Sequence, residues 1–166
     1  MFSKHPPFLW NKPSHLICNL SVFYYFYAIN KTVTTMIYRF TIISDEVDDF
    51  VREIQIDPEA TFFDLHEAIL KAANYTNDQM TSFFICDDDW EKEKEITLEE
   101  MDNNPEMDSW IMKETRLNEL IEDEKQKLLY VFDYMTERCF FIELSEIITG
   151  KEIKGAKSVS YTHLRA

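Results

Sequence analysis

The sequence predicts one α+β domain, in which a mixed or antiparallel sheet of about five strands packs on one main helix. Short runs of β-branched and aromatic residues recur between turn residues from residue 36 to residue 150 and indicate strands. Residues 62–73 instead place apolar side chains at helical spacing. A chain of 166 residues with 45% hydrophobic content has room for one domain with a core, but hardly for two.

The first predicted elements form a hairpin. Residues 36–44 (MIYRFTIIS) and 50–56 (FVREIQI) are rich in strand-forming residues. The polar residues 45–49 (DEVDD) form the turn between them. Pro58 then ends the sheet locally, because proline cannot donate a ladder hydrogen bond.

The main helix is predicted directly after this hairpin. Thr61 can cap its first turn, and Asp64 can accept from the free amides in a variant of the capping box. The helix is expected to end between residues 74 and 77. Its apolar face consists of Phe62, Leu65, Ile69 and Ala72, with Ala68 and Ala73 beside them.

The second half of the chain predicts further strands around an irregular stretch. Residues 82–86 (SFFIC) predict a buried strand, and residues 95–98 predict another. A loop around Pro105 is expected over residues 99–110, and a short helix over residues 115–121.

Two strands close the predicted domain as a hairpin, giving the order β-β-α-β, an irregular stretch, then β-β. They are residues 127–134 (KLLYVFDY) and 139–147 (CFFIELSEI). The first has apolar residues on both faces, so we expect it to be a central strand.

Composition excludes several classes of function. The formal charge of −14 repels phosphate backbones, so direct nucleic-acid binding is not expected. Gly150 and Gly155 are the only glycines, which excludes a P-loop and a dinucleotide-binding fingerprint. Three cysteines without metal-ligand spacing predict reduced thiols in a cytoplasmic protein.

Both ends of the chain differ in composition from its middle. Residues 1–35 contain no acidic residue, whereas the remainder contains all 31, so residues 1–35 are expected to be non-native translation upstream of a start at Met36. A signal or anchor segment and an ordered arm remain alternatives. Residues 158–166 are similar to a translated sequencing adapter. The domain is therefore expected over residues 36–157, with a charge of −18 and no membrane segment.

The acidic run after the buried strand is the first candidate for a site. Asp87, Asp88 and Asp89 could hold a hard cation, and strand alternation would point Asp87 and Asp89 to one side. The run lacks the glycine that an EF-hand loop needs. A solvated shoulder that prevents edge pairing of strands is the competing interpretation, and the one we favour.

Asp133 is the third carboxylate of interest, because it lies among apolar residues on the predicted central strand. Such a group should be paired, hydrogen-bonded or raised in pKa. Pairing with Arg39, Arg52 or Arg138 would give it a structural role.

The remaining candidates are single residues. His66, the one histidine within residues 36–157, lies one position off the apolar helical face and is expected to bond to a neighbouring carboxylate. Cys86 and Cys139 are expected to be buried, inert thiols. Trp90 and Trp110 flank the acidic segment and either cover its apolar side or mark a partner-binding patch.

Several segments resemble the plasmid pRiA4b ORF-three-like family over residues 36–150. They are YRFTI, the helix in DPEATFFDLHEAILKAANY, the strand SFFI, and LLYVFDY…FFIEL. The resemblance implies an α+β domain of β-grasp-like order from bacterial or archaeal genomes, plasmids or mobile elements. Its biochemical role is unassigned, although some members carry a transposon-passenger label.

The closing strands depart from that family's pattern. Many relatives close with Tyr-Asp-Phe-Gly-Asp-x-Trp-x-His, but here residues 132–140 keep only the aspartate, as Asp133. Any site that depends on the missing histidine is absent from this chain.

Three functions remain open at this point. The first is a non-enzymatic acidic interaction module that meets a protein with a basic surface and needs no cofactor. The second is an acidic DNA mimic, which requires a long, regular stripe of carboxylates. The third is a divalent-cation-dependent enzyme or cation-binding protein that uses Asp87, Asp89 and Asp133.

Overall fold

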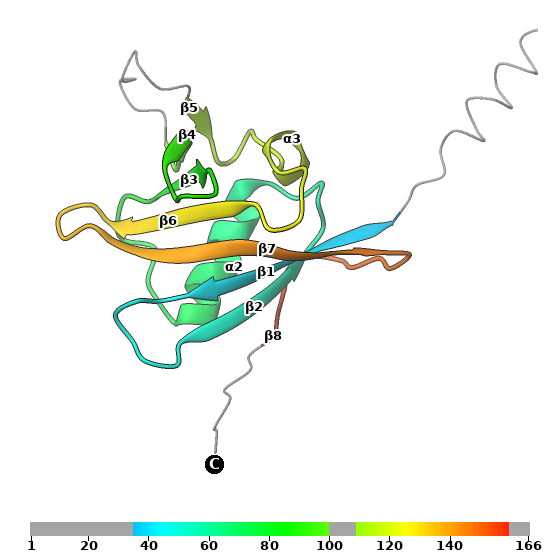
Figure 1. The fold of residues 1–166 in the computed structure, drawn as a ribbon, viewed down its shortest axis with the longest axis horizontal. Coiled ribbons are helices and arrows are strands. Elements are labelled where there is room, and N and C mark those ends of the chain that lie inside the picture. Colours follow the sequence, from blue (N-terminus) through cyan, green and yellow to red (C-terminus); the bar gives the residue numbers. More distant parts are fainter. Residues whose placement is uncertain (1–34, 100–108, 160–166) are drawn as a thin grey trace, which may run out of the picture. The chain divides into compact units, whose positions relative to one another are not determined.

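The computed structural model describes residues 35–99 and 109–159. Their strands form a single sheet of eight strands in the order β5-β4-β3-β6-β7-β1-β2-β8 (Figure 1). The strands are β1 (Met36–Ile43), β2 (Val51–Ile56), β3 (Ser82–Cys86), β4 (Lys92–Thr97), β5 (Ser109–Ile111), β6 (Lys127–Asp133), β7 (Arg138–Thr149) and β8 (Lys157–Val159). The helices are α2 (Phe62–Ala73) and α3 (Leu117–Leu120). Neighbouring strands pair antiparallel except β4 and β5, which are parallel.

The predicted five-strand sheet on one main helix, in β-grasp-like order, is therefore wrong. The sheet has eight strands, and the second helix, α3, has four residues. The prediction fell short because β5 and β8 have three residues each, too few to show a strand pattern. They form because the edges of β4 and β2 offer unpaired backbone groups.

The charged strand β4 is also longer than the strand predicted over residues 95–98. Its sequence, KEKEIT, starts three residues earlier than expected, and its first two residues are exposed. Pairing with the buried strand β3 overrides the low strand propensity of lysine and glutamate. Most of the loop expected over residues 99–110 lies outside the described residues, as do residues 1–34 and 160–166, but residues 109–110 belong to β5 and not to a loop.

The predicted main helix is confirmed together with its cap. The Thr61 side chain accepts from the Asp64 backbone N–H at 3.2 Å, and the Asp64 carboxylate accepts from the Thr61 N–H at 2.8 Å. These bonds satisfy amides that have no partner within the helix. Asn74 ends the helix in the left-handed conformation, with φ 57°.

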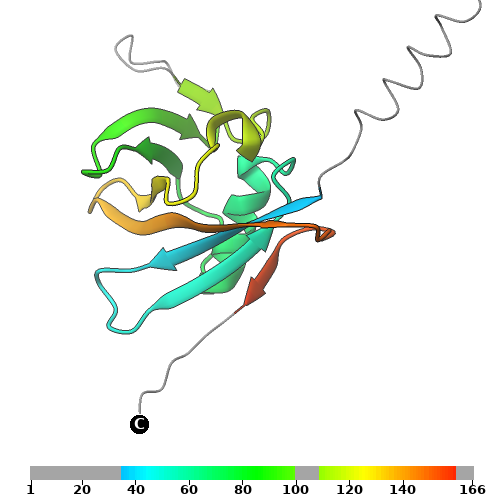
Figure 2. The same cartoon turned by 45° about the vertical axis from the view of Figure 1, so that its right-hand side comes forward.

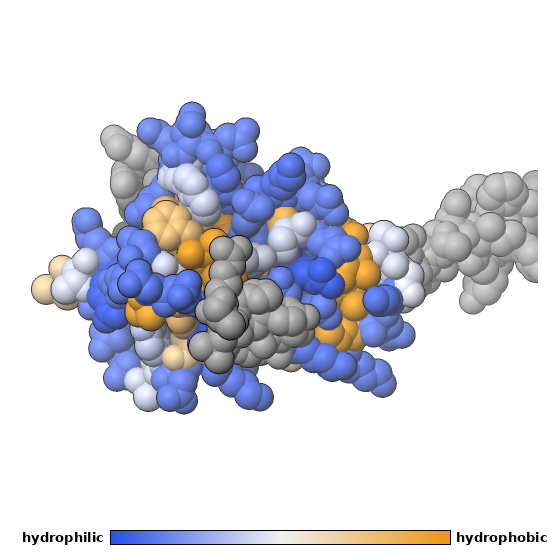
Figure 3. Space-filling view, turned by 60° about the horizontal axis from the view of Figure 1, so that its bottom comes forward, coloured by the Kyte–Doolittle hydropathy of each residue, from blue (hydrophilic) through white to orange (hydrophobic). Residues whose placement is uncertain are grey.

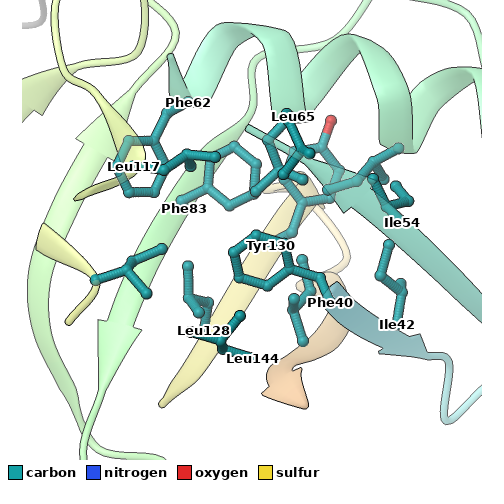
Figure 4. Packing of buried hydrophobic residues seen from close by; sticks show 14 of the residues in the cluster. Phe40, Ile42, Ile54, Phe62, Leu65, Phe83, Leu117, Leu128, Tyr130 and Leu144 are labelled. Atoms are coloured by element: carbon teal, nitrogen blue, oxygen red, sulfur yellow. The ribbon is translucent and has the colours of Figure 1, made fainter. Parts of the chain in front are cut away.

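Helix α2 lies against one face of the sheet (Figure 2), and the main core consists of side chains packed between the two. Phe62, Leu65 and Ile69 of the helix are buried against it, and Tyr130 of β6 lies in the middle of the packed side chains (Figure 4). Burying each large apolar side chain contributes about 1.5–3 kcal/mol. The Tyr38 hydroxyl donates to the Ile121 carbonyl at 2.8 Å and so fixes the segment after α3.

A smaller cluster lies on the opposite face of the sheet, which neither of the two described helices covers. Phe84, Cys86, Leu129 and Val131 are buried there, with Trp90, Cys139 and Phe141 packed against them. Because β6 contributes buried residues to both clusters and pairs with β3 and β7, the prediction that it is central is confirmed. Much of the described surface is hydrophilic, as the side in Figure 3 shows.

Candidate functional site: an acidic groove at the β3–β4 turn

The acidic run forms the tight turn between β3 and β4. The Asp87 Oδ1 atom accepts from the backbone N–H groups of Asp89 and Glu91, both at 2.9 Å. The Trp90 N–H donates to the Asp87 carbonyl at 3.2 Å, and Trp90 has a positive φ of 66°. Asp87 therefore has a structural role, because aspartate side chains that accept from the following amides stabilise turns.

A groove of about 480 Å³ lies between this turn and the segment that joins α3 to β6. It is lined by Cys86, Asp87, Asp88, Lys94, Glu119, Leu120, Glu122, Asp123, Glu124, Lys125, Gln126 and Lys127. We call it the acidic groove, because six of these side chains are carboxylates and three are lysines. Within residues 35–99 and 109–159, ion pairs join Arg39 to Glu146 and Arg138 to Glu46, so no groove carboxylate is in an ion pair.

The two tryptophans predicted as a partner-binding patch lie beside this groove. The Lys127 Nζ atom is 5.2 Å from the centroid of the Trp90 ring, and the Lys94 Nζ atom is 5.9 Å from that of Trp110. The Trp90 ring also meets Phe141 edge-on at 5.0 Å. Both indoles are half-buried, and groove lysines sit over their faces in cation–π geometry.

The three carboxylates considered for a cation do not converge. Asp87 follows the end of β3 that pairs with Lys127, whereas Asp133 ends β6. Lys127 and Asp133 are six positions apart along β6, so their Cα atoms are about 20 Å apart at 3.3 Å per residue. Asp87 and Asp133 therefore lie at opposite ends of the sheet. Asp89 is exposed in the turn. No group of three or more His, Cys, Asp or Glu side chains in the described ranges could hold a metal ion.

Asp133 is the last residue of β6, next to the β6–β7 turn, and not the buried carboxylate that its neighbours predict. Its Oδ2 atom accepts from the Thr136 hydroxyl at 2.7 Å, and its Oδ1 atom accepts from the N–H groups of Met135 and Thr136. The hydrogen bond from the Thr136 hydroxyl lowers the pKa of Asp133, with a smaller contribution from the charge of Arg138.

His66 is fully buried, contrary to the expected position at the edge of the apolar face. Its Nδ1 atom lies 2.8 Å from the Tyr130 hydroxyl, and its Nε2 atom lies 3.3 Å from the Asn77 Oδ1 atom. Because that amide oxygen can only accept, Nε2 carries the proton and Nδ1 accepts from Tyr130. Burial lowers the pKa of His66 and raises the pKa of Tyr130, so both are neutral.

Cys86, which is buried, and Cys139, which is half-buried, are poor nucleophiles. Burial raises the pKa of the Cys86 thiol to about 11 and also raises the pKa of Cys139. A thiol reacts through its thiolate, so both side chains act as small apolar residues. The prediction of buried thiols is confirmed for Cys86, whereas Cys139 is half-buried, and both are free.

Comparison with known proteins identifies the family. The family model for "Plasmid pRiA4b ORF-3-like protein" matches residues 37–160. The fold is similar to the crystal structure of MM3350, a protein of unknown function from Methanosarcina mazei Go1. The TM-score is 0.62 and the identity 17%, and the match covers 76% of this chain and 70% of that chain.

No curated protein matches the chain significantly. Within residues 35–99 and 109–159, no helix has the length and apolar character needed to cross a membrane. The structural match, at 17% identity, shows a shared fold and no more. The family match spans most of the chain and agrees with the resemblance of its helix and closing strands. The chain therefore belongs to the plasmid pRiA4b ORF-3-like family, whose function is not known.

Proposed function

We propose that this domain is a non-enzymatic interaction module that binds a basic segment of a partner protein in the acidic groove. The observation that carries the proposal is the set of six groove carboxylates, none of them in an ion pair within the described residues, beside two half-buried tryptophans. Unpaired carboxylates around a hollow favour a cationic ligand. Arginine and lysine side chains are the cations that a protein partner offers.

The tryptophans add a second kind of contact. Lys94 and Lys127 occupy the ring faces in the free protein, and an arginine of the partner could replace them, because a guanidinium stacks well on indole. The overall acidic charge would steer a basic partner toward the domain from a distance. Binding would therefore weaken as salt concentration rises.

The titratable core residues favour binding over catalysis. His66 is buried and already bonded to Tyr130 and Asn77, so it has no free nitrogen for proton transfer to a substrate. The groove carboxylates come from the β3–β4 turn, from the short helix α3 and from the segment after it. This compact arrangement of carboxylates suits the binding of one basic segment. It is not the long, regular stripe of carboxylates that a DNA mimic requires.

Binding of a fluorescein-labelled octa-arginine peptide to the full chain tests the proposal. The groove variant Asp88→Asn/Glu122→Gln/Asp123→Asn removes three exposed carboxylates. The control Glu59→Gln/Glu67→Gln/Glu152→Gln removes the same charge from exposed positions outside the groove. At about 0.5 kcal/mol per exposed charge, the groove variant should bind about tenfold more weakly. Equal losses in both variants would show diffuse attraction and refute the groove as the site.

A further inference from the structure

The exposed apolar side chains of this domain gather at one end, away from the acidic groove. The large hydrophobic residues that are exposed within the described ranges are Ile43 (47%), Val47 (52%), Tyr75 (39%), Met80 (51%), Tyr134 (43%) and Met135 (93%). They belong to the end of β1 and to three connections: β1–β2, α2–β3 and the β6–β7 hairpin. In Figure 1 the β1–β2 and β6–β7 turns project from the same side of the sheet. We call this the loop-end surface.

Side-chain contacts hold the three connections of the loop-end surface in place. Arg138 at the start of β7 forms a two-pronged ion pair with Glu46 of the β1–β2 connection, with contacts of 2.8 and 2.9 Å. The Tyr75 ring packs on Phe132 at 5.3 Å and on Phe140 at 5.9 Å. The three connections are therefore tied to one another, and a partner would meet a preorganised surface.

A hollow of about 360 Å³ opens in this surface, between the α2–β3 connection and the β6–β7 hairpin. Leu70, Tyr75 and Phe132 contribute apolar walls, and Thr81, Asp133 and Arg138 contribute polar ones. Its size is at the small end of the range for ligand pockets, about 300–1,000 Å³. An apolar side chain of a partner could anchor there.

Charge determines which partner suits this surface. Residues 45–49 include four carboxylates, Asp78 and Glu137 bring the total in the three connections to six, and Asp133 at the end of β6 adds a seventh. Residues 44–50, 74–81 and 133–137 contain no lysine or arginine, and the adjacent Arg138 is engaged by Glu46. A second copy of the domain would bring like charges together, so charge complementarity selects a different, basic partner.

We propose that the loop-end surface is a second docking site, which binds a basic amphipathic segment of another protein. An apolar side chain of that segment enters the hollow, and its lysines or arginines meet the surrounding carboxylates. Met80 and Met135 do not line the hollow, but they are exposed in the same two connections and would contact the rest of the segment's apolar face, because methionine side chains adapt to varied apolar partners. Helical segments with one apolar face bind such grooves in many complexes.

Two labelled 18-residue peptides of equal charge test this proposal on the full chain. One consists of leucine and lysine, with the leucines placed at helical spacing so that they form one face, and the other replaces every leucine with serine. The chain should bind the leucine peptide at least tenfold more tightly. Met80→Ser/Met135→Ser should remove at least fivefold of that affinity, whereas Asp88→Asn/Glu122→Gln/Asp123→Asn should leave the ratio between the peptides unchanged.

Several outcomes would overturn the second site. Equal binding of the two peptides would show charge attraction alone, and an unaffected Met80→Ser/Met135→Ser variant would place the apolar contact elsewhere. Sedimentation that shows a dimer of the full chain, lost in that methionine variant, would assign the surface to self-association. A thermal midpoint within about 2 °C of wild type would verify that the variant is folded, since exposed substitutions change stability little. None of these outcomes would affect the proposal for the acidic groove. That proposal is tested by the loss of octa-arginine binding in the groove variant, which changes different residues.

Discussion

Replacing Tyr130 with phenylalanine tests the buried polar cluster that ties α2 to the sheet. The substitution removes one hydroxyl and keeps the ring, which packs at 4.8 Å from Phe83 and in parallel with Phe140 at 6.3 Å. The lost hydroxyl lies 2.8 Å from the His66 Nδ1 atom. The variant therefore changes hydrogen bonding while leaving the aromatic packing in place.

The expected cost is about 2 kcal/mol. A typical internal hydrogen bond contributes about 1 kcal/mol net, and a buried acceptor left without a partner costs about 1–3 kcal/mol. The Thr81 hydroxyl, 3.3 Å from the same nitrogen, can recover part of that cost. For a domain of this size, 2 kcal/mol corresponds to a fall of about 8 °C in Tm.

Urea unfolding at pH 7.5, followed by circular dichroism, measures this change. The midpoint should fall while the slope stays constant, because the surface exposed on unfolding is unchanged. Tyr75→Phe is the matched control. It removes a hydroxyl from an exposed ring and should cost less than about 0.5 kcal/mol. If Tyr130→Phe were as stable as wild type, the cluster would not hold the helix on the sheet.

Three further predictions concern pH and the ends of α2. Burial lowers the pKa of His66 in the folded state, so the stability that His66 contributes is present above its unfolded pKa of about 6.5 and is lost as pH falls through the folded pKa. The free energy of unfolding should therefore change less between pH 7 and pH 5 in His66→Gln than in wild type. An equal change in both proteins would contradict this role of His66. Thr61→Ala breaks the capping box and should cost about 1 kcal/mol in urea unfolding, whereas the exposed control Thr76→Ala should cost little. Asn74→Ala places an alanine at φ 57° and should lower Tm by about 4 °C, while Asn74→Gly should not; a stable Asn74→Ala chain would refute the strained cap.

Features encoded by neighbouring residues were predictable from the sequence. The helix over residues 62–73 was predictable, because its cap, its first-turn carboxylate and its apolar spacing all lie within one segment. The central position of β6 followed from apolar residues on both of its faces. Such local signals survive in the fold because tertiary packing agrees with them.

Features that depend on distant residues were not predictable. β5 and β8 exist only because β4 and β2 offer them hydrogen bonds. His66 is buried because Tyr130, 64 residues later, supplies its partner. The only sequence signal for this pair was a tyrosine in the middle of an apolar strand, which needs a polar partner when buried.

The candidate site shows the same division. Trp90, Trp110 and the acidic run were identified from the sequence, but the carboxylates in and after α3 lie beside them only because of the fold. Asp87 and Asp133 drew attention as possible ligands, and both instead accept from backbone amides in turns. Short acidic turns and acidic ligand sites have the same composition, so the sequence alone does not separate them.

Titration of the ¹⁵N-labelled full chain with octa-arginine, followed by amide chemical shifts, tests the acidic groove most directly. The largest changes should fall on Asp87, Asp88, the Trp90 indole N–H and residues 122–127, which line or flank the groove. They should weaken in 0.5 M salt. Changes of equal size around Glu59 and Glu67, or an unperturbed Trp90, would contradict a defined binding site and leave only general attraction to an acidic surface.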